Sequence, residues 1–186
     1  MRHYTLKPGF TLVEVLVSIG IFTVLTGVVL SNYRGYNTNA LFANASEDIV
    51  LALRQAQVYG VGVKKNIALC GASSFDCGYG VYFTIGNQIK IFADSNDDKK
   101  YDALDTVVET ITFQSPISVT ALYCGILNCS GNVLSVTFKR PNPDAVIRDT
   151  TATVHESAMI TISNGVLGVG AKTSIITISK TGQISI

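Results

Sequence analysis

Charge and histidine are scarce in this sequence, and their scarcity excludes several classes of function. Only 15% of the 186 residues are charged, with 14 lysines and arginines against 13 aspartates and glutamates. These totals do not support a strongly basic surface that binds nucleic acid. The sequence also holds no nucleophile elbow, no Walker loop and no H-E-x-x-H motif. Beyond His3 the only histidine is His155, beside Glu156, which we interpret as a surface or packing residue. We therefore predict that the protein is not an enzyme.

One long apolar stretch stands out against this background. From Phe10 to Ser31, a run of 22 residues, the only ionisable side chain is Glu14. As a helix the run would be about 33 Å long at about 1.5 Å per residue, enough to cross a bilayer core of about 30 Å. Arg2 and Lys7 precede it, which predicts that the N-terminal end stays cytoplasmic and the rest is exported. No A-x-A cleavage site follows the run, so we expect it to remain on the mature protein.

Glu14 is the anomaly in this apolar run. A carboxylate near the start of a membrane helix costs on the order of 2–3 kcal/mol, and less near the interface. Such an acid indicates a functional site and requires a cationic partner. If the chain is cut after Gly9, the new α-amino group of Phe10 supplies that cation, within the same chain or a neighbouring one. The alternative is that Glu14 lies among the lipid headgroups without a specific partner.

The segment K-P-G-F-T-L-V-E-V-L at residues 7–16 resembles the class III signal of type IV prepilins and type II secretion pseudopilins. This resemblance implies that prepilin peptidase cuts between Gly9 and Phe10 and N-methylates Phe10. It also implies that Glu14 guides docking into a growing filament, with other pilin or pseudopilin subunits and an inner-membrane assembly platform as partners. The chain would then comprise a cleaved leader at 1–9, a transmembrane or filament-core helix at 10–31 and a periplasmic or extracellular domain at 32–186.

After Ser31 the sequence turns polar but keeps a helical spacing, and strand-like segments follow. An apolar stripe recurs at steps of three and four residues, at Leu41, Ala45, Ile49, Ala52, Leu53 and Ala56. We predict one helix from about Thr11 to Tyr59, ended by Gly60 and Gly62. Segments rich in β-branched and aromatic residues follow at 61–69, 79–85, 88–93, 106–113, 117–122, 133–138, 159–162, 174–178 and 183–186. This order predicts an α+β fold, with an antiparallel sheet packed on the helix.

Three stretches of the body resemble one branch of the same family. Residues 49–57, the region at 92–94 and the closing segment 178–184 are similar to H-type minor pseudopilins and FimT-like minor pilins. The resemblance implies a structural minor subunit of a type IV pilus or a type II secretion pseudopilus. The alternative is a binding module for DNA uptake or adhesion, displayed by such a filament. Some FimT-like pilins bind DNA through arginines around a C-terminal Gly-Arg element. Here Gln183 follows Gly182 and no arginine lies beyond Arg148, which argues against nucleic acid as a partner.

The four cysteines form two close pairs, Cys70 with Cys77 and Cys124 with Cys129. An exported domain lies in an oxidising compartment, where such pairs become disulfides. Free thiols and a zinc site are the alternatives. The gaps of six and four residues fit zinc poorly, because zinc sites usually show C-x-x-C spacing.

One acidic segment has the spacing of a calcium-binding loop. In residues 94–105, oxygen donors stand at positions 1, 3, 5, 9 and 12, as in an EF-hand-type loop. Position 6 is Lys99 where a glycine is usual, and position 12 is an aspartate rather than a glutamate. The alternative is a plain solvated loop between strands, since Asp and Asn favour turns. The candidate ligands are the side chains of Asp94, Asn96, Asp98, Asp102 and Asp105 and the carbonyl of Lys100.

Overall fold

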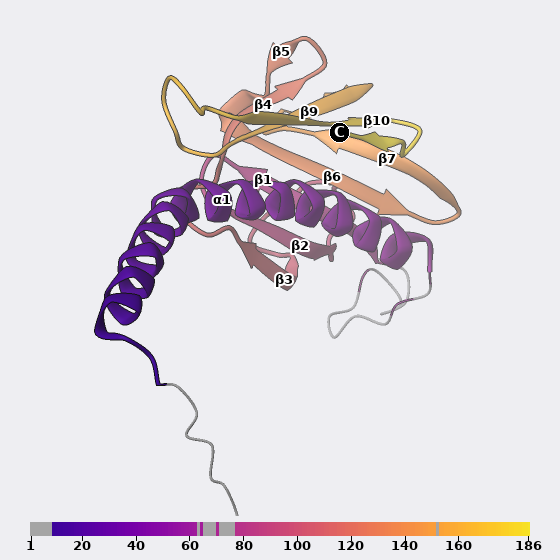
Figure 1. Cartoon of the computed structure of the whole chain (residues 1–186). Coiled ribbons are helices and arrows are strands. Elements are labelled where there is room, and N and C mark those ends of the chain that lie inside the picture. The colour runs from indigo at the N-terminus through magenta and orange to yellow at the C-terminus, as the bar shows by residue number, and fades with distance from the viewer. Residues whose placement is uncertain (1–8, 63, 65–69, 71–76, 152) are drawn as a thin grey trace, which may run out of the picture. The chain divides into compact units, whose positions relative to one another are not determined.

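The computed structural model describes residues 9–62, 64, 70, 77–151 and 153–186, and at residues 32–36 it describes the backbone alone. In this part of the chain, helix α1 (Leu12–Val61) comes first and all strands follow it (Figure 1). The chain divides into two compact units, Met1–Asn39 and Ala40–Ile186, and α1 contributes residues to both. The order of a long helix and then antiparallel sheets confirms the predicted α+β fold class.

Helix α1 begins and ends within two residues of the predicted helix. In the second unit, its buried apolar side chains belong to the apolar stripe seen in the sequence, with Ile49 and Leu53 wholly inside the core. Gly60 lies in the last turn, where a Cβ atom would collide with the backbone carbonyl of Phe138. The helix end can therefore approach strand β6 closely only because residue 60 has no side chain.

The first sheet has six antiparallel strands in the order β3-β2-β1-β6-β7-β8. Every neighbouring pair is antiparallel, and β1 lies between β2 and β6 along its full length. A short 3-10 helix, η1 (Ser130–Asn132), leads into β6. The strands are β1 (Gly78–Thr84), β2 (Gln88–Asp94), β3 (Thr106–Thr112), β6 (Val133–Lys139), β7 (Asn142–Arg148) and β8 (Val154–His155).

The second sheet has five antiparallel strands in the order β11-β10-β9-β4-β5. Strand β9 is its centre and pairs with β10 on one side and β4 on the other. Along β9 buried and half-buried residues alternate strictly, so one face of this sheet points into the core. The strands are β4 (Ser118–Cys124), β5 (Leu127–Asn128), β9 (Ser157–Ser163), β10 (Thr173–Ser179) and β11 (Ile184–Ser185).

The structure differs from the sequence prediction in the number of sheets and in several strands. The single predicted sheet is two sheets, whose inner faces share one core with residues 45–56 of α1. Two packed layers enclose apolar side chains that one open sheet would leave half exposed. Strand β7 was not predicted, because Pro141 directly precedes it and Pro143 is its second residue. The register of β7 against β6 shifts between Phe138 and Lys139, which leaves Pro143 outside the ladder.

Most of the strand predicted at 61–69 lies outside the described residues, and Val61 itself is the last residue of α1.

Candidate functional site

The segment around Gly9 and Phe10 precedes the helix and is accessible. Phe10 is 83% exposed, and no atom lies within 4 Å of the place where a side chain on Gly9 would begin. Residues 9–11 are not helical, so the peptide bond between Gly9 and Phe10 lies in irregular backbone. A peptidase requires such an unpaired, exposed bond, and the predicted cleavage position satisfies this requirement.

Thr11 and Glu14 together start the helix. The Glu14 amide donates a hydrogen bond of 3.2 Å to Oγ1 of Thr11, which makes Thr11 the N-terminal cap of α1. The sequence T-L-V-E is the spacing of a capping box, a signal that our reading of the sequence missed. The position also favours an acid, because a carboxylate in the first turn interacts well with the helix dipole. The bond to Thr11 uses the backbone amide of Glu14, so its carboxylate stays available for the predicted role in assembly.

The apolar run of α1 is exposed along its whole length, and Leu12–Ser31 is long and apolar enough to cross a membrane. Its hydroxyl groups are satisfied within the helix itself. Ser18, Thr23 and Thr26 each donate to the backbone carbonyl four residues earlier, at 2.7–2.8 Å. Since these hydroxyls need no water, the run presents a surface suited to lipid or to other apolar helices.

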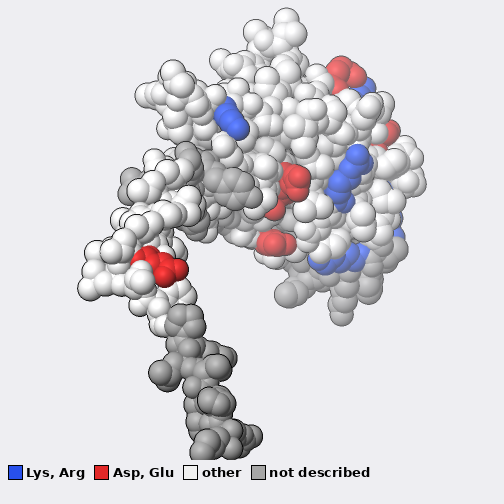
Figure 2. Space-filling view, viewed as in Figure 1, with Lys and Arg blue, Asp and Glu red and all other residues white. Residues whose placement is uncertain are grey.

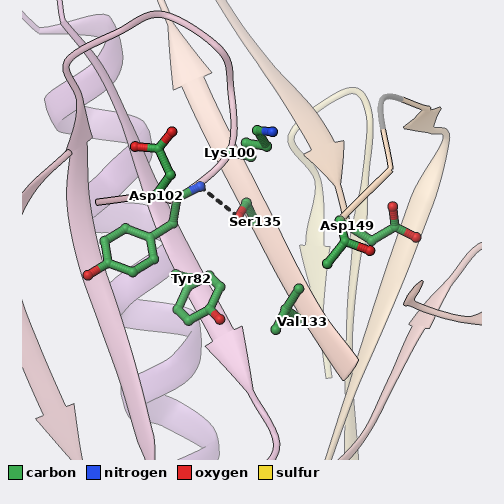
Figure 3. Close-up of a pocket in the computed structure, with 8 residues that line it drawn as sticks. Tyr82, Lys100, Asp102, Val133, Ser135 and Asp149 are labelled. Atoms are coloured by element: carbon green, nitrogen blue, oxygen red, sulfur yellow. Dashed lines mark hydrogen bonds between the residues drawn. The ribbon is translucent and has the colours of Figure 1, made fainter. Parts of the chain in front are cut away.

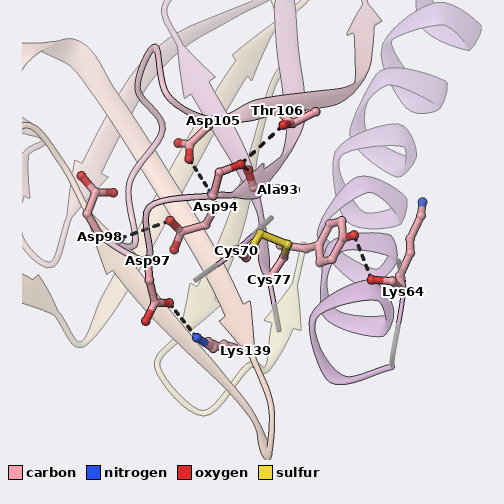
Figure 4. The surroundings of a disulfide bond; sticks show 12 residues. Lys64, Cys70, Cys77, Ala93, Asp94, Asp97, Asp98, Asp105, Thr106 and Lys139 are labelled. Carbon is pink, nitrogen blue, oxygen red and sulfur yellow. Dashed lines mark hydrogen bonds and ion pairs between the residues drawn. A yellow bond between two sulfur atoms is a disulfide. The ribbon is translucent and has the colours of Figure 1, made fainter. Parts of the chain in front are cut away.

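The acidic segment 94–105 folds as a tight loop around two carboxylates, of which Asp94 is buried and Asp105 is half-buried. Asp94 accepts hydrogen bonds from the amides of Asp98 (3.2 Å) and Lys99 (3.1 Å). Asp105 accepts from the amides of Ser95 and Asp102, both at 2.9 Å. These bonds tie Asp94 to the middle of the loop and Asp105 to both Ser95 and Asp102, and Figure 4 shows the bond between Asp98 and Asp94.

Burial has an electrostatic cost for both carboxylates. It raises the pKa of Asp105 to about 6, and it also raises the pKa of Asp94. Lys99 lies 3.7 Å from the carboxylate of Asp94 and partly offsets this effect.

Two residues of this loop, Asp97 and Lys99, adopt positive φ angles of 64° and 66°. Lys99 therefore takes the left-handed conformation for which a glycine was expected at position 6. The loop oxygens are occupied by the chain, since the amide of Asn96 also donates to Asp102 at 3.0 Å. Within the described residues, no three of the loop's carboxylates have oxygens that all lie within 4.8 Å of one another. Calcium binding at this loop stays a prediction.

Both predicted cysteine pairs are disulfides in the structure, and no free cysteine remains. This finding rules out zinc and free thiols at these positions. Cys70–Cys77 packs with Tyr79 and Ala93 beside the acidic loop (Figure 4). Cys124–Cys129 closes the turn between β4 and β5, with Cα atoms 4.9 Å apart.

His155 lies against the carboxylate of Asp149. Its Nε2 lies 3.4 Å from a carboxylate oxygen of Asp149. Asp149 in turn accepts hydrogen bonds from the amides of Ser130 (2.9 Å) and Thr151 (2.7 Å). Burial alone would raise the pKa of Asp149, but the bonds from Thr151 and Ser130 outweigh it and lower the pKa. Cys124 lies beside this pair, but its sulfur is held in the disulfide and cannot bind a metal.

A cavity of about 270 Å³ lies next to Asp149 on the first sheet (Figure 3). Tyr82 and Tyr101 form one wall, with ring centroids 4.7 Å apart. The hydroxyl of Ser135 accepts a hydrogen bond from the amide of Tyr101 at 3.1 Å, and Asp149 is bonded as described above.

Comparison with known proteins identifies the anchor alone. Residues 7–30 match the prokaryotic N-terminal methylation motif. This motif indicates the type IV pilin and pseudopilin family, whose members are typically structural proteins that are cleaved, methylated and assembled. No curated protein and no solved structure matches the chain. The N-terminal segment thus carries a prepilin-type methylation motif, and the body that follows has two antiparallel sheets and two disulfides.

Proposed function

We propose that this chain is a minor pilin or pseudopilin of a type IV pilus or a type II secretion pseudopilus. The observation that carries the proposal is the methylation motif at residues 7–30, which covers most of the helical segment Leu12–Ser31, whose side chains are all exposed. Prepilin peptidase would remove residues 1–9 and methylate Phe10. Residues 10–31 would anchor the protein in the inner membrane and later enter the filament core, while residues 32–186 face the periplasm or the outside.

The move from lipid to filament core conserves the burial of the apolar run. Exposing apolar side chains to water would cost about 25 cal/mol of hydrophobic free energy for each Å² exposed. Transfer into an apolar filament core avoids this cost. The remaining charge on the run is Glu14, and cleavage at Gly9 creates an α-amino group four residues away. We propose that Glu14 pairs with such an amino group as the subunit enters the filament, with neighbouring subunits and the inner-membrane platform as partners.

The assignment to the H-type and FimT-like branch rests on the sequence resemblance of the body. Nucleic acid is not a proposed partner of this body. Lysines on the body alternate with acids and pair with them, as Lys139 does with Asp97 at 2.9 Å and Lys180 with Glu156 at 2.8 Å. Figure 2 shows basic and acidic side chains interspersed on the globular unit, with no continuous basic stripe on the face in view.

Mass spectrometry of the N-terminus tests the processing step directly. Protein purified from cells that contain prepilin peptidase should begin at Phe10 and carry one added methyl group. Protein from cells without the peptidase should begin at Met1 or Arg2. An N-terminus that retains residues 1–9 in the presence of the peptidase would contradict the proposal.

A further inference from the structure

The strands of the second sheet carry no charge. No lysine, arginine, histidine, aspartate or glutamate occurs in β4, β5, β9, β10 or β11. Charged residues do occur in the first sheet, in strands β2, β3, β6 and β7. Because surfaces are normally rich in charge, a whole sheet face without any indicates a surface that is covered by a partner.

The outward side chains of this sheet form an ordered block. Residues opposite each other in an antiparallel ladder lie side by side on one face. In one row across the strands, Ile175 is opposite Thr161, and Thr161 is opposite Ala121. In the next row, Thr177 is opposite Met159, and Met159 is opposite Tyr123. We call these six residues the charge-free face: Ile175, Thr161, Ala121, Thr177, Met159 and Tyr123.

Two apolar tips extend the charge-free face at opposite ends. The first tip is the turn at residues 125–127, held by the Cys124–Cys129 disulfide, in which Ile126 is 94% exposed. The second tip is the loop at residues 165–170, in which Leu167 and Val169 are 95% and 102% exposed. These three are the most exposed large apolar side chains of the second unit.

The register of the strands places the two tips at opposite ends of the sheet. The first tip follows Cys124, which pairs with Ala158 at the start of β9. The second tip follows Ser163, which pairs with both Ser118 and Thr173 at the other end of β9.

This arrangement is complementary to itself. A two-fold axis in the plane of the face, midway between the tips, brings the first tip of one chain onto the second tip of another, and the reverse contact forms at the same time. No like charges oppose the approach, because the face has none. A charged partner surface would have to give up its hydration without gaining an ion pair.

We propose that the charge-free face and its two tips bind a second copy of this chain in this two-fold arrangement. The contact lies on the second sheet and does not depend on the helix or on processing at Gly9. The proposal therefore stands or falls independently of the proposed function. In a filament system, such a contact would join subunits or neighbouring filaments side by side.

Cross-linking of the full chain in membranes tests the arrangement. Because the native cysteines are all in disulfides, a short bis-maleimide reacts only with introduced thiols. Two tagged forms of different size, one with Ile126→Cys and one with Leu167→Cys, are produced together in a bacterium that lacks pilus and type II secretion genes. We expect a cross-linked species that contains both tags.

Matched pairs distinguish this contact from chance encounters. Leu104→Cys combined with Leu167→Cys is the control, since Leu104 is also exposed but lies in the acidic loop. This control and the pairs with the same position on both chains should give only background. Cross-linking of Ile126→Cys with Leu167→Cys that does not exceed the control would overturn the proposal. Equally strong cross-linking between two Ile126→Cys chains would also overturn it.

A charge placed in the middle of the face gives an independent test. Ile175 is half exposed, so Ile175→Lys leaves the core intact, but it would bury two unpaired ammonium groups in the two-fold contact. We expect cross-linking to fall to the control level. Val107→Lys, at a comparably exposed position on β3 of the first sheet, should leave it unchanged. If Ile175→Lys cross-links as strongly as Val107→Lys, the face is not covered by a second copy and the proposal is wrong.

Discussion

Isoleucine and leucine side chains serve opposite purposes in the two units of this chain. From Leu12 to Leu30 they are exposed on every side of the helix, and none of that segment is buried within the chain. In the second unit Ile49, Leu53 and their neighbours from both sheets form one closed core. The body buries its apolar side chains in its own core. The apolar side chains of the anchor have no such core and would need lipid or other subunits to cover them.

Hydrogen bonding shows the same difference between the units. In the anchor every described side-chain bond is local, from a residue to one three or four positions earlier. In the body, bonds join residues far apart in sequence, such as the one from Gln57 of α1 to the carbonyl of Pro143 at 3.1 Å. Local bonds do not depend on groups outside the helix, so the proposed move from membrane to filament would leave these bonds of the anchor intact.

The largest expected effect is on assembly, and it concerns the charge of the anchor. Glu14→Ala should abolish incorporation into filaments, because the proposed ion pair with the α-amino group is lost while the span remains apolar. The subunit should still be found in the membrane fraction. Ser18→Ala is the control, since it removes only a local bond to the carbonyl of Glu14 in the same helix. The measurement is the amount of subunit in sheared filaments relative to membranes, and normal incorporation of Glu14→Ala would refute the assembly role.

A pair of glycine substitutions tests whether only the body is closely packed. Gly60→Ala should destabilise the body by about 3 kcal/mol, because the new methyl group meets the rigid carbonyl of Phe138. Gly20→Ala should change stability by less than about 1 kcal/mol, since no atom lies within 4 Å of the new methyl group. Thermal unfolding of both variants in detergent checks the contrast. Equal effects would mean that the two units are packed alike.

Asp149 tests the dependence of the body on internal hydrogen bonds and on pH. Asp149→Asn should cost about 2 kcal/mol at pH 7, because an amide nitrogen would replace an acceptor of the Ser130 or Thr151 amide. The pKa of Asp149 is lowered in the folded state, so its carboxylate stabilises the body above pH 4. That contribution is lost as pH falls below 4 through the folded-state pKa. The difference between the wild type and Asp149→Asn should therefore shrink on acidification, and a constant difference would contradict this account.

Calcium is expected to produce the smallest effect, again confined to the body. Millimolar calcium should raise the melting temperature by about 2–4 °C, which corresponds to about 1 kcal/mol for a domain of this size. The gain is small because the ion must displace bonds that the loop oxygens already make, such as Lys99 with Asp94. Asp94→Asn should remove the calcium effect, whereas Asp144→Asn, on β7, should keep it. No shift at millimolar calcium would exclude the site.

The anchor could be predicted almost completely from sequence. The span, the position of Glu14 and the methylation motif are local features, and the helix begins within one residue of the predicted start. The two disulfides were also predicted, since each closes a short loop between nearby cysteines. Even the missed cap at Thr11 has a local signal, the T-L-V-E spacing.

The body was predicted only in part. Most strands were found from their composition, but β7 was missed because Pro141 and Pro143 obscure it, and pairing with β6 is what makes it a strand. The division into two sheets was also not predictable, because it depends on which inner faces share a core. The same holds for the charge-free face. Its residues are scattered from Ala121 to Thr177, and only the register brings them together.

The sequence by itself therefore determined the N-terminal anchor, because the apolar span and the methylation motif each consist of consecutive residues. The tertiary structure decided which strands are neighbours, which carboxylates are buried at the acidic loop and which uncharged residues share one outer face. The physical reason is the range of the interactions. Helix hydrogen bonds join residues three or four positions apart, and the apolar character of a span is a property of consecutive residues. Strand pairing joins residues that are far apart in the chain, and nothing in the sequence marks them as partners.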